Sequence, residues 1–213
     1  MSLLSADDRE YLEREFQAKL KDKVVLDFFS DGTEPSRLTE QILEELAALN
    51  GQISVRRHNL PEDSTARRLG IDKAPAIVVR RPGGASGVRF YGVPAGYEFG
   101  SLVEDIIDVS RGTIDLPRDA LEELRELESD VHIQVFVTPG CPYCPRAVRT
   151  AHKLALASKH VIADMVMATD FNGLANRYGI SAVPHTVVNE KFSFVGALPE
   201  REFLAQVLKA VGH

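Results

Sequence analysis

The sequence predicts an α/β protein made of two tandem modules with one fold, each a mixed sheet flanked by helices. Residues 69–79 recur as residues 178–188 at an offset of 109, with Gly, Ile, Pro and two Val coinciding. Residues 90–92 match residues 194–196, and residues 96–99 match residues 200–203 as the start of a last helix. Three blocks in the same order indicate a duplicated module.

The first module shows alternating helix and strand patterns. A helix is expected to begin near Ser5, with Asp8 as its capping partner, because Leu12, Phe16 and Leu20 then recur on one face. The pattern next predicts strands at residues 24–29 and 53–58 with a helix at 35–49 between them, a short helix ending at 69–70, a hairpin of 76–80 with 88–92, and a closing helix.

The second module repeats this order. Pro117 is expected at the first position of a lead-in helix. Strands at 131–137 and 161–166, a helix at 142–158, a short helix ending at 178–179, a hairpin of 185–189 with 192–196 and a closing helix follow. A right-handed crossover makes the first two strands parallel. The order β-α-β-α-β-β-α is that of the thioredoxin fold.

The boundary between the modules is expected where Gly112 breaks the helical pattern, which gives modules at residues 1–112 and 113–213. The link is short, so we expect the two modules to pack against each other.

Composition excludes several functional classes. The 213 residues are 44% hydrophobic and 26% charged, as in ordinary soluble domains, and the formal net charge is −6. A general nucleic-acid or membrane-surface binder would need a basic face instead. No apolar run reaches the roughly 18 residues of a membrane span, and the N-terminus is acidic, so a cytoplasmic protein is expected. In that compartment two neighbouring cysteines indicate metal binding or redox catalysis.

The two cysteines form the motif Cys141-Pro142-Tyr143-Cys144 between a predicted strand and a predicted helix. A helix N-terminus favours an anion, so Cys141 is predicted to be the nucleophilic thiolate. Cys144 is expected one turn into the helix as the resolving thiol. The alternatives are an inert buried pair, half a zinc site, or an iron–sulfur site completed by other ligands. No two histidines have zinc-ligand spacing, and we expect no metal and no cofactor besides the Cys141–Cys144 redox disulfide.

Val183-Pro184 follows Cys144 by 40 residues and enters a predicted strand. A cis peptide bond there would turn the backbone of Val183 toward the cysteines, where it could pair with an extended substrate segment. The alternative is a trans proline at a strand start. Together with Pro142 and Tyr143, these residues are the predicted substrate contacts.

The chain resembles the protein disulfide oxidoreductases of thermophilic archaea and bacteria, which are also called glutaredoxin-like proteins. The resemblance covers essentially the whole chain, and its motifs are residues 91–96, 104–111, 135–145, 147–149 and 151–153. It implies dithiol–disulfide exchange on protein substrates, with cis bonds at Ala74-Pro75 and Val183-Pro184. Cys-Pro-Tyr-Cys is also the glutaredoxin motif.

The sequence departs from this family in two places. Gly32 and Pro35 stand where the first module would carry cysteines, so that module is expected to be redox-inactive. A cysteine-free first module beside an active second one also resembles the N-terminal domain of flavin-linked alkyl hydroperoxide reductases. Thioredoxin's Trp before the first cysteine is Gly140 here, and its buried Asp has no clear counterpart, since the strand offers His132 and Gln134. No proton acceptor for Cys144 is assigned.

Other polar residues near these motifs have a simple structural interpretation beside a functional one. Arg146, Arg149 and Lys153 could attract an acidic substrate or glutathione, but a solvated helix face is expected. His185 could lie near the sulfurs, but an exposed strand-end histidine is expected. Asp31 and Glu34 are expected to be solvated turn residues.

The functional prediction is a thiol–disulfide oxidoreductase acting on protein disulfides. Its partners would be those substrates and an upstream donor, either a thioredoxin reductase-like enzyme or glutathione, because the sequence has no flavin or nicotinamide fingerprint. One alternative is an electron relay dedicated to a peroxidase partner such as a peroxiredoxin. Another is a non-catalytic interaction protein that uses its first module. No nucleic-acid or membrane partner is expected.

Overall fold

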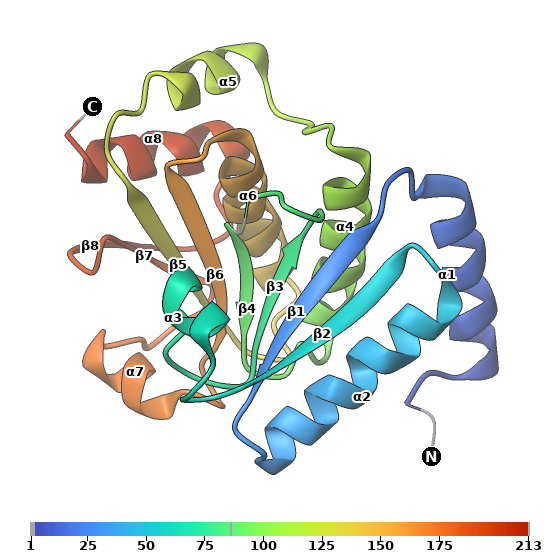
Figure 1. Ribbon diagram of the computed structural model, residues 1–213. Helices are drawn as coiled ribbons and strands as arrows, with labels where there is room; N and C mark the ends of the chain where they lie inside the picture. Colours follow the sequence, from blue (N-terminus) through green and yellow to red (C-terminus); the bar gives the residue numbers. More distant parts are fainter. Residues whose placement is uncertain (1–2, 86, 213) are drawn as a thin grey trace.

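The computed structural model describes residues 3–85 and 87–212 (Figure 1). We keep the names first module for residues 1–112 and second module for residues 113–213. The elements of the first are α1 (Ala6–Lys19), β1 (Val24–Ser30), α2 (Glu34–Leu49), β2 (Ile53–Asn59), α3 (Ser64–Leu69), β3 (Ala76–Arg80), β4 (Val88–Tyr91) and α4 (Tyr97–Arg111). Those of the second are α5 (Arg118–Arg125), β5 (Val131–Val137), α6 (Cys144–Ala157), β6 (Val161–Met167), α7 (Asn172–Arg177), β7 (His185–Val188), β8 (Phe192–Val195) and α8 (Glu200–Ala210).

All the described strands belong to one continuous sheet with the order β2-β1-β3-β4-β6-β5-β7-β8. In each module the first two strands are parallel, and the third and fourth add antiparallel neighbours. The modules meet where β4 pairs with β6 in parallel, from Val88 opposite Ala163 to Tyr91 opposite Val166. This pairing confirms the expected fixed packing of the two modules.

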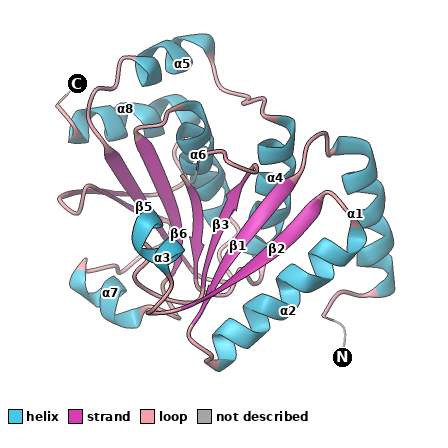
Figure 2. Ribbon diagram, in the orientation of Figure 1, coloured by secondary structure: helices cyan, strands magenta, loops and turns pink. Residues whose placement is uncertain are grey.

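Each face of the sheet carries its own hydrophobic core. One face is covered by buried side chains from six helices, α1, α2, α4, α5, α6 and α8 (Figure 2). The other face is covered by buried side chains from α3 and α7. Strand residues alternate between the two cores, as Phe28 and Phe29 of β1 do. Both cysteines belong to the larger core, which lies on the α4 and α6 side.

Most of the predicted local features are confirmed. The Ser5 hydroxyl accepts the Asp8 backbone N–H at 3.1 Å and donates to the Asp8 carboxylate at 2.6 Å. The expectation for Pro117 is wrong by one residue, because its extended backbone (ψ 145°) makes it the N-cap of α5. The peptide bonds before Pro75 and Pro184 are cis, as expected, and so is the bond before Pro61, which was not predicted.

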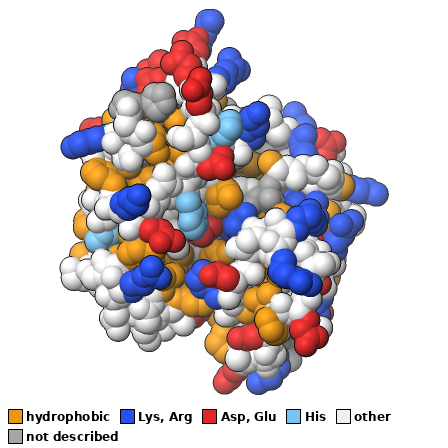
Figure 3. Space-filling model, turned by 60° about the vertical axis from the view of Figure 1, so that its left-hand side comes forward, with side chains coloured by type: hydrophobic (Ala, Val, Ile, Leu, Met, Phe, Trp, Pro, Cys, Tyr) orange, Lys and Arg blue, Asp and Glu red, His pale blue; other side chains and the backbone are white. Residues whose placement is uncertain are grey.

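The surface of the described residues is mixed in charge. Figure 3 shows acidic and basic side chains interspersed over one face, without a large region of a single sign. Within residues 3–85 and 87–212, every helix is too short or too polar to cross a lipid bilayer.

Candidate redox site

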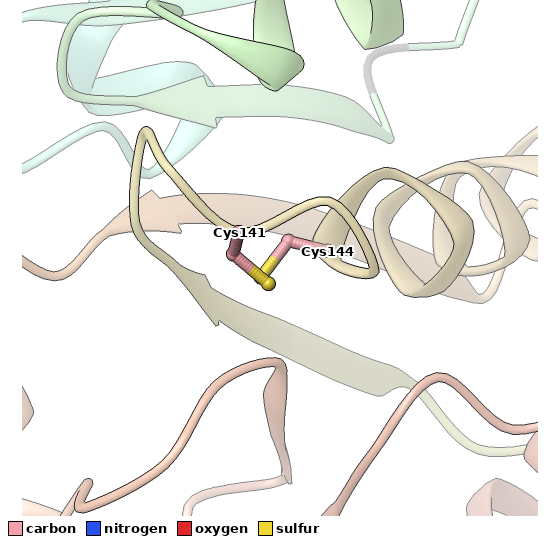
Figure 4. The surroundings of a disulfide bond; sticks show 2 residues. All are labelled: Cys141 and Cys144. Carbon is pink, nitrogen blue, oxygen red and sulfur yellow. A yellow bond between two sulfur atoms is a disulfide. The ribbon is translucent and has the colours of Figure 1, made fainter.

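The two cysteines are joined by a disulfide bond in the turn between β5 and α6 (Figure 4). The Cys141 N–H donates to the Thr138 carbonyl at 3.2 Å, and the Cys144 N–H donates to the Cys141 carbonyl at 3.4 Å. These bonds form a turn through Pro142 and Tyr143, so α6 begins at Cys144. The expectation that the helix starts at Pro142 and that Cys144 lies one turn inside it is therefore wrong. Cys141 still precedes the helix N-terminus.

The two sulfur-bearing residues differ in accessibility. Cys141 is 8% exposed and Cys144 is fully buried, while Tyr143 between them is 71% exposed and Pro142 is also exposed. A partner that approaches the turn therefore meets Cys141 first. This difference agrees with the expectation that Cys144 is the less accessible of the pair.

Val183 and Pro184 lie at the same edge of the sheet as the disulfide turn. They directly precede β7, which pairs with β5 so that His185 lies opposite Phe136. Val183 is partly exposed, Pro184 is buried, and the Pro184 carbonyl accepts the Gly196 N–H at 2.9 Å. The structure thus brings the predicted substrate contacts to one end of the molecule.

The first module contacts the redox turn directly, which was not predicted. The Tyr97 N–H, at the start of α4, donates to the Pro139 carbonyl at 3.3 Å. Gly96 has φ 61°, and a Cβ atom on it would lie only 2.1 Å from the Pro139 oxygen. A residue with a side chain does not fit between the start of α4 and the turn that carries Cys141.

Glu98 is a buried acid in the first turn of α4. It is fully buried, and neither carboxylate oxygen has hydrogen-bond geometry with any described residue. Burial raises the pKa of Glu98, and interactions with Ser101 and His152 offset this only in part. The residue escaped prediction, although an acid on the same helical face as Leu102 and Ile106 is a detectable signal.

Arg149 and His152 of α6 bind groups of the first module. Arg149 forms ion pairs with three carboxylates of α4, those of Glu104, Asp105 and Asp108. His152 Nδ1 lies 2.6 Å from Asp105 Oδ2. Burial lowers the pKa of His152 to about 3. The expected solvated helix face is wrong for Arg149, whose side chain is 12% exposed, because these contacts bury it.

The other basic residues of this helix face differ in their contacts. Lys153 donates to Glu200 at 2.6 Å and its side chain is 18% exposed, so the solvated interpretation is wrong for it as well. Arg146 is exposed, as expected. Because acids of α4 and α8 neutralise Arg149 and Lys153, the basic run is not a free anion site.

His185 differs from its expected position. It is 8% exposed rather than solvated, since β7 lies inside the sheet, and burial lowers its pKa. His185 pairs with Phe136, and Val187 is the next residue on the same face of β7. Phe136 and Val187 belong to the core under α7, on the sheet face opposite the disulfide. It therefore does not join the sulfurs.

The remaining polar candidates also lie apart from the disulfide. Gln134 pairs with Val187 in the sheet and thus lies on the α7 side, and His132 bonds to Asp164 at 2.6 Å. Asp31 accepts hydrogen bonds from Thr33 and Ser36 within its own turn. None of these three residues takes the place of thioredoxin's buried acid.

The comparison with protein families concerns the second module. Residues 131–209 match the family model described as "Thioredoxin domain". We call this matching part of the second module, residues 131–209, the thioredoxin domain. With the repeated architecture of the first module, the fold class is confirmed as tandem thioredoxin-like folds, and the thioredoxin domain is the one that carries the Cys141–Cys144 disulfide.

Two solved structures match the tandem arrangement over nearly the whole chain. One is a point mutant of the alkylhydroperoxide reductase AhpF from Enterococcus faecalis, with 28% identity, a TM-score of 0.88, and coverage of 96% of this chain and 99% of that one. The other is a protein disulfide oxidoreductase from Aeropyrum pernix, with 29% identity, a TM-score of 0.86, and coverage of 97% and 93%. The thioredoxin domain and its partner module thus have the fold of thiol–disulfide oxidoreductases.

The curated relatives are longer proteins. One named "NADH dehydrogenase", from Ferdinandcohnia aciditolerans, is 25% identical over 166 residues, which are 78% of this chain and 30% of that protein. The chain spans between 30% and 38% of the length of the first curated relatives it matches.

Proposed function

We propose that the protein is a thiol–disulfide oxidoreductase that exchanges its Cys141–Cys144 pair with protein disulfides. The observation that carries this proposal is the disulfide at the start of α6, where Cys141 keeps 8% of its surface exposed and Cys144 is fully buried. The likeness to the Aeropyrum pernix protein disulfide oxidoreductase over both modules supports it.

The exchange takes two steps. The Cys141 thiolate attacks one sulfur of a substrate disulfide, which forms a mixed disulfide and releases the other substrate sulfur as a thiolate. The Cys144 thiolate then attacks Cys141, which restores the internal disulfide and releases the second substrate thiolate. Two electrons pass to the substrate, and a donor must return them to the pair.

Each residue of the site has a proposed role. The N-terminus of α6 stabilises the Cys141 thiolate. Val183 and Pro184, with Pro142 and Tyr143, contact the substrate beside Cys141. Cys144 must lose its proton before it attacks, and buried Glu98 is the proposed acceptor, because it lies in the helical turn that begins at the Tyr97–Pro139 contact.

The proposed setting is the cytoplasm, with protein disulfides as substrates and no cofactor besides the cysteine pair. The donor is a thioredoxin reductase-like enzyme or glutathione. The first module, which has no cysteine, takes no part in electron exchange and supports the thioredoxin domain, so we retain the division into residues 1–112 and 113–213.

Turnover of insulin disulfides with dithiothreitol as donor tests the proposal, with dithiobis-nitrobenzoate as a small disulfide. The wild type should accelerate the reduction of both, and Cys141→Ser should be inactive on both. Full biological function of Cys141→Ser would instead support the alternative of a non-catalytic interaction protein.

A trapping experiment tests the order of attack. Cys144→Ser should accumulate a mixed disulfide between Cys141 and the substrate, visible on a non-reducing gel. Turnover by Cys144→Ser at the wild-type rate without added thiol would exclude the two-cysteine mechanism.

A second candidate function is an electron relay dedicated to one peroxidase partner, such as a peroxiredoxin. The observation that favours it is the match to the alkylhydroperoxide reductase AhpF over almost the whole chain. Rates on a panel of disulfide proteins discriminate the two. A strong preference for a peroxidase over insulin indicates the relay, and comparable rates indicate the general enzyme.

A further inference from the structure

Two side chains of the redox helix α6 are held by polar groups of the first module. Arg149 forms its ion pairs with carboxylates of α4, at residues 104, 105 and 108. His152 contacts Asp105 of α4 through Nδ1 and the Arg89 carbonyl of β4 through Nε2. Asp105 binds both α6 side chains, so it links the cysteine-free module to the helix that begins at Cys144.

Burial makes the hydrogen-bond arrangement of this cluster restrictive. The side chains of Asp105 and His152 are 0% exposed. A buried polar group without a partner costs about 1–3 kcal/mol, so each ring nitrogen should have a matching partner. In a neutral imidazole one nitrogen donates and the other accepts.

His152 faces an acceptor at both ring nitrogens. Nε2 lies 3.1 Å from the Arg89 carbonyl oxygen, which can only accept, so Nε2 must carry a proton. Nδ1 lies 2.6 Å from Asp105 Oδ2, which also only accepts when the carboxyl is ionised. A neutral ring beside an ionised carboxylate would leave one of the two contacts without a hydrogen atom.

We propose that the Asp105–His152 pair holds one proton more in total than a neutral imidazole and an ionised carboxylate would hold. Through this shared proton Asp105 acts as a positioning residue for the redox site. The inference rests on the proposed function. The charged groups that bear on the pair are Arg149 on α6, Glu98 on α4 and Asp164 on β6.

The pair can influence sulfur chemistry because it holds α6 in place. Arg149 and His152 lie in the second and third turns after Cys144, and the amides at the start of this helix are the groups that stabilise a Cys141 thiolate. Loss of the anchor would loosen their alignment and raise the pKa of the Cys141 thiol.

Three full-length variants test the positioning role, with the pH profile of Cys141 alkylation in the reduced protein as readout. Asp105→Ala removes both contacts and should slow alkylation at pH 7 by about threefold to tenfold, the size of a helix-terminus effect. Asp105→Asn should stay within about twofold of wild type, because its amide supplies the donor for Nδ1 and the acceptor for Arg149, as a protonated carboxyl does. Glu104→Ala, which removes an exposed carboxylate from the same arginine, should match wild type.

The outcomes separate the possibilities. A wild-type profile in Asp105→Ala overturns the positioning role, and a loss in Asp105→Asn as large as in Asp105→Ala overturns the shared proton. If Asp105→Ala does not fold, Arg149→Lys replaces it, since it keeps the charge but loses the planar fork. Wild-type turnover of insulin reports separately on the proposed function.

Nitrogen-15 NMR of the wild-type histidine ring gives a second, variant-free test. Protons on both ring nitrogens of His152, or a proton on Nε2 together with a protonated Asp105 carboxyl in the carbon-13 spectrum, support the shared proton, and a proton on Nε2 alone beside an ionised Asp105 overturns it. A proton on Nδ1 with a bare Nε2 overturns it.

Discussion

The contact between Gly96 and Pro139 predicts opposite effects on stability for alanine at two glycines, Gly96 at the N-cap of α4 and Gly100 inside that helix. Gly96→Ala places a Cβ atom 2.1 Å from the Pro139 oxygen, whereas real Cβ atoms essentially never approach closer than 3.0 Å, so the two backbones must separate by about 0.9 Å. The backbone of Gly96, at φ 61° and ψ −129°, is also one that side chains disfavour. Such a conformation costs about 1–3 kcal/mol before the overlap is counted.

The matched control is Gly100→Ala, four residues further along α4. A Cβ atom at Gly100 has nothing within 4 Å, and its φ is not in the positive range. Alanine inside a helix is about 0.8–1.0 kcal/mol more favourable than glycine, so this variant should be stabilised.

The assay is thermal unfolding of the oxidised protein at pH 7. About 1 kcal/mol corresponds to roughly 2–4 °C for a protein of this size. Gly96→Ala should therefore unfold at least a few degrees below wild type, and Gly100→Ala a few degrees above it. Gly96→Ala should also slow disulfide exchange, because Pro139 belongs to the turn that carries Cys141, while Gly100→Ala should not. A Gly96→Ala protein as stable and as active as wild type would refute this reasoning.

Three further predictions follow from the site. Brief iodoacetamide treatment of the reduced protein near neutral pH should label Cys141 before Cys144 in a peptide map, and the reverse order would contradict the assigned nucleophile. The raised pKa of Glu98 means that the folded protein binds this proton more tightly than the unfolded chain. Relative to Glu98→Gln, wild type should therefore lose stability as pH rises from about 4.5 through the pKa of Glu98 in the folded protein. Urea unfolding at several pH values measures this, and a difference in unfolding free energy between the two proteins that stays constant with pH would exclude it. Residues 113–213 alone should still reduce dithiobis-nitrobenzoate. They should be less stable than the full chain and slower on protein disulfides, because β6 and α6 lose their β4 and α4 partners. Equal stability and equal rates would show that the first module is dispensable.

Features that depend on a short stretch of chain could be predicted. Strand alternation, the repeat at residues 69–79 and 178–188, and the position of the cysteine motif after a buried strand are all local patterns. The start of α6 could not be predicted, because Pro142 and Pro145 both suit a first helical turn and the preceding turn decides between them.

The contacts between the modules could not be predicted, for a physical reason. Glu98 and Asp105 are visible in the sequence as acids on an apolar helical face, but the partners of Asp105, His152 and Arg149, lie more than 40 residues away. Gly96 is one of 15 glycines, and only the approach of Pro139 distinguishes it. Periodicity reports which side of a helix is buried and not which groups it meets.

The continuous sheet has a consequence for self-association. β4 of the first module joins β6 of the second, and the free ends of the sheet are β8, the counterpart of β4, and β2, the counterpart of β6. A second molecule could thus add to the first by the same kind of pairing, and since this contact is head-to-tail, repetition would build a filament. The two outer strands differ from the inner ones in ways that oppose it. β2 carries Arg56 and Arg57, and β8 is partly exposed along its length, whereas β4, which is equally short, is buried throughout. A fold in which β4 pairs with β6 therefore requires outer strands whose side chains differ from those of the inner pair. Replacing Arg56 and Arg57 of β2 by apolar residues would favour polymerisation.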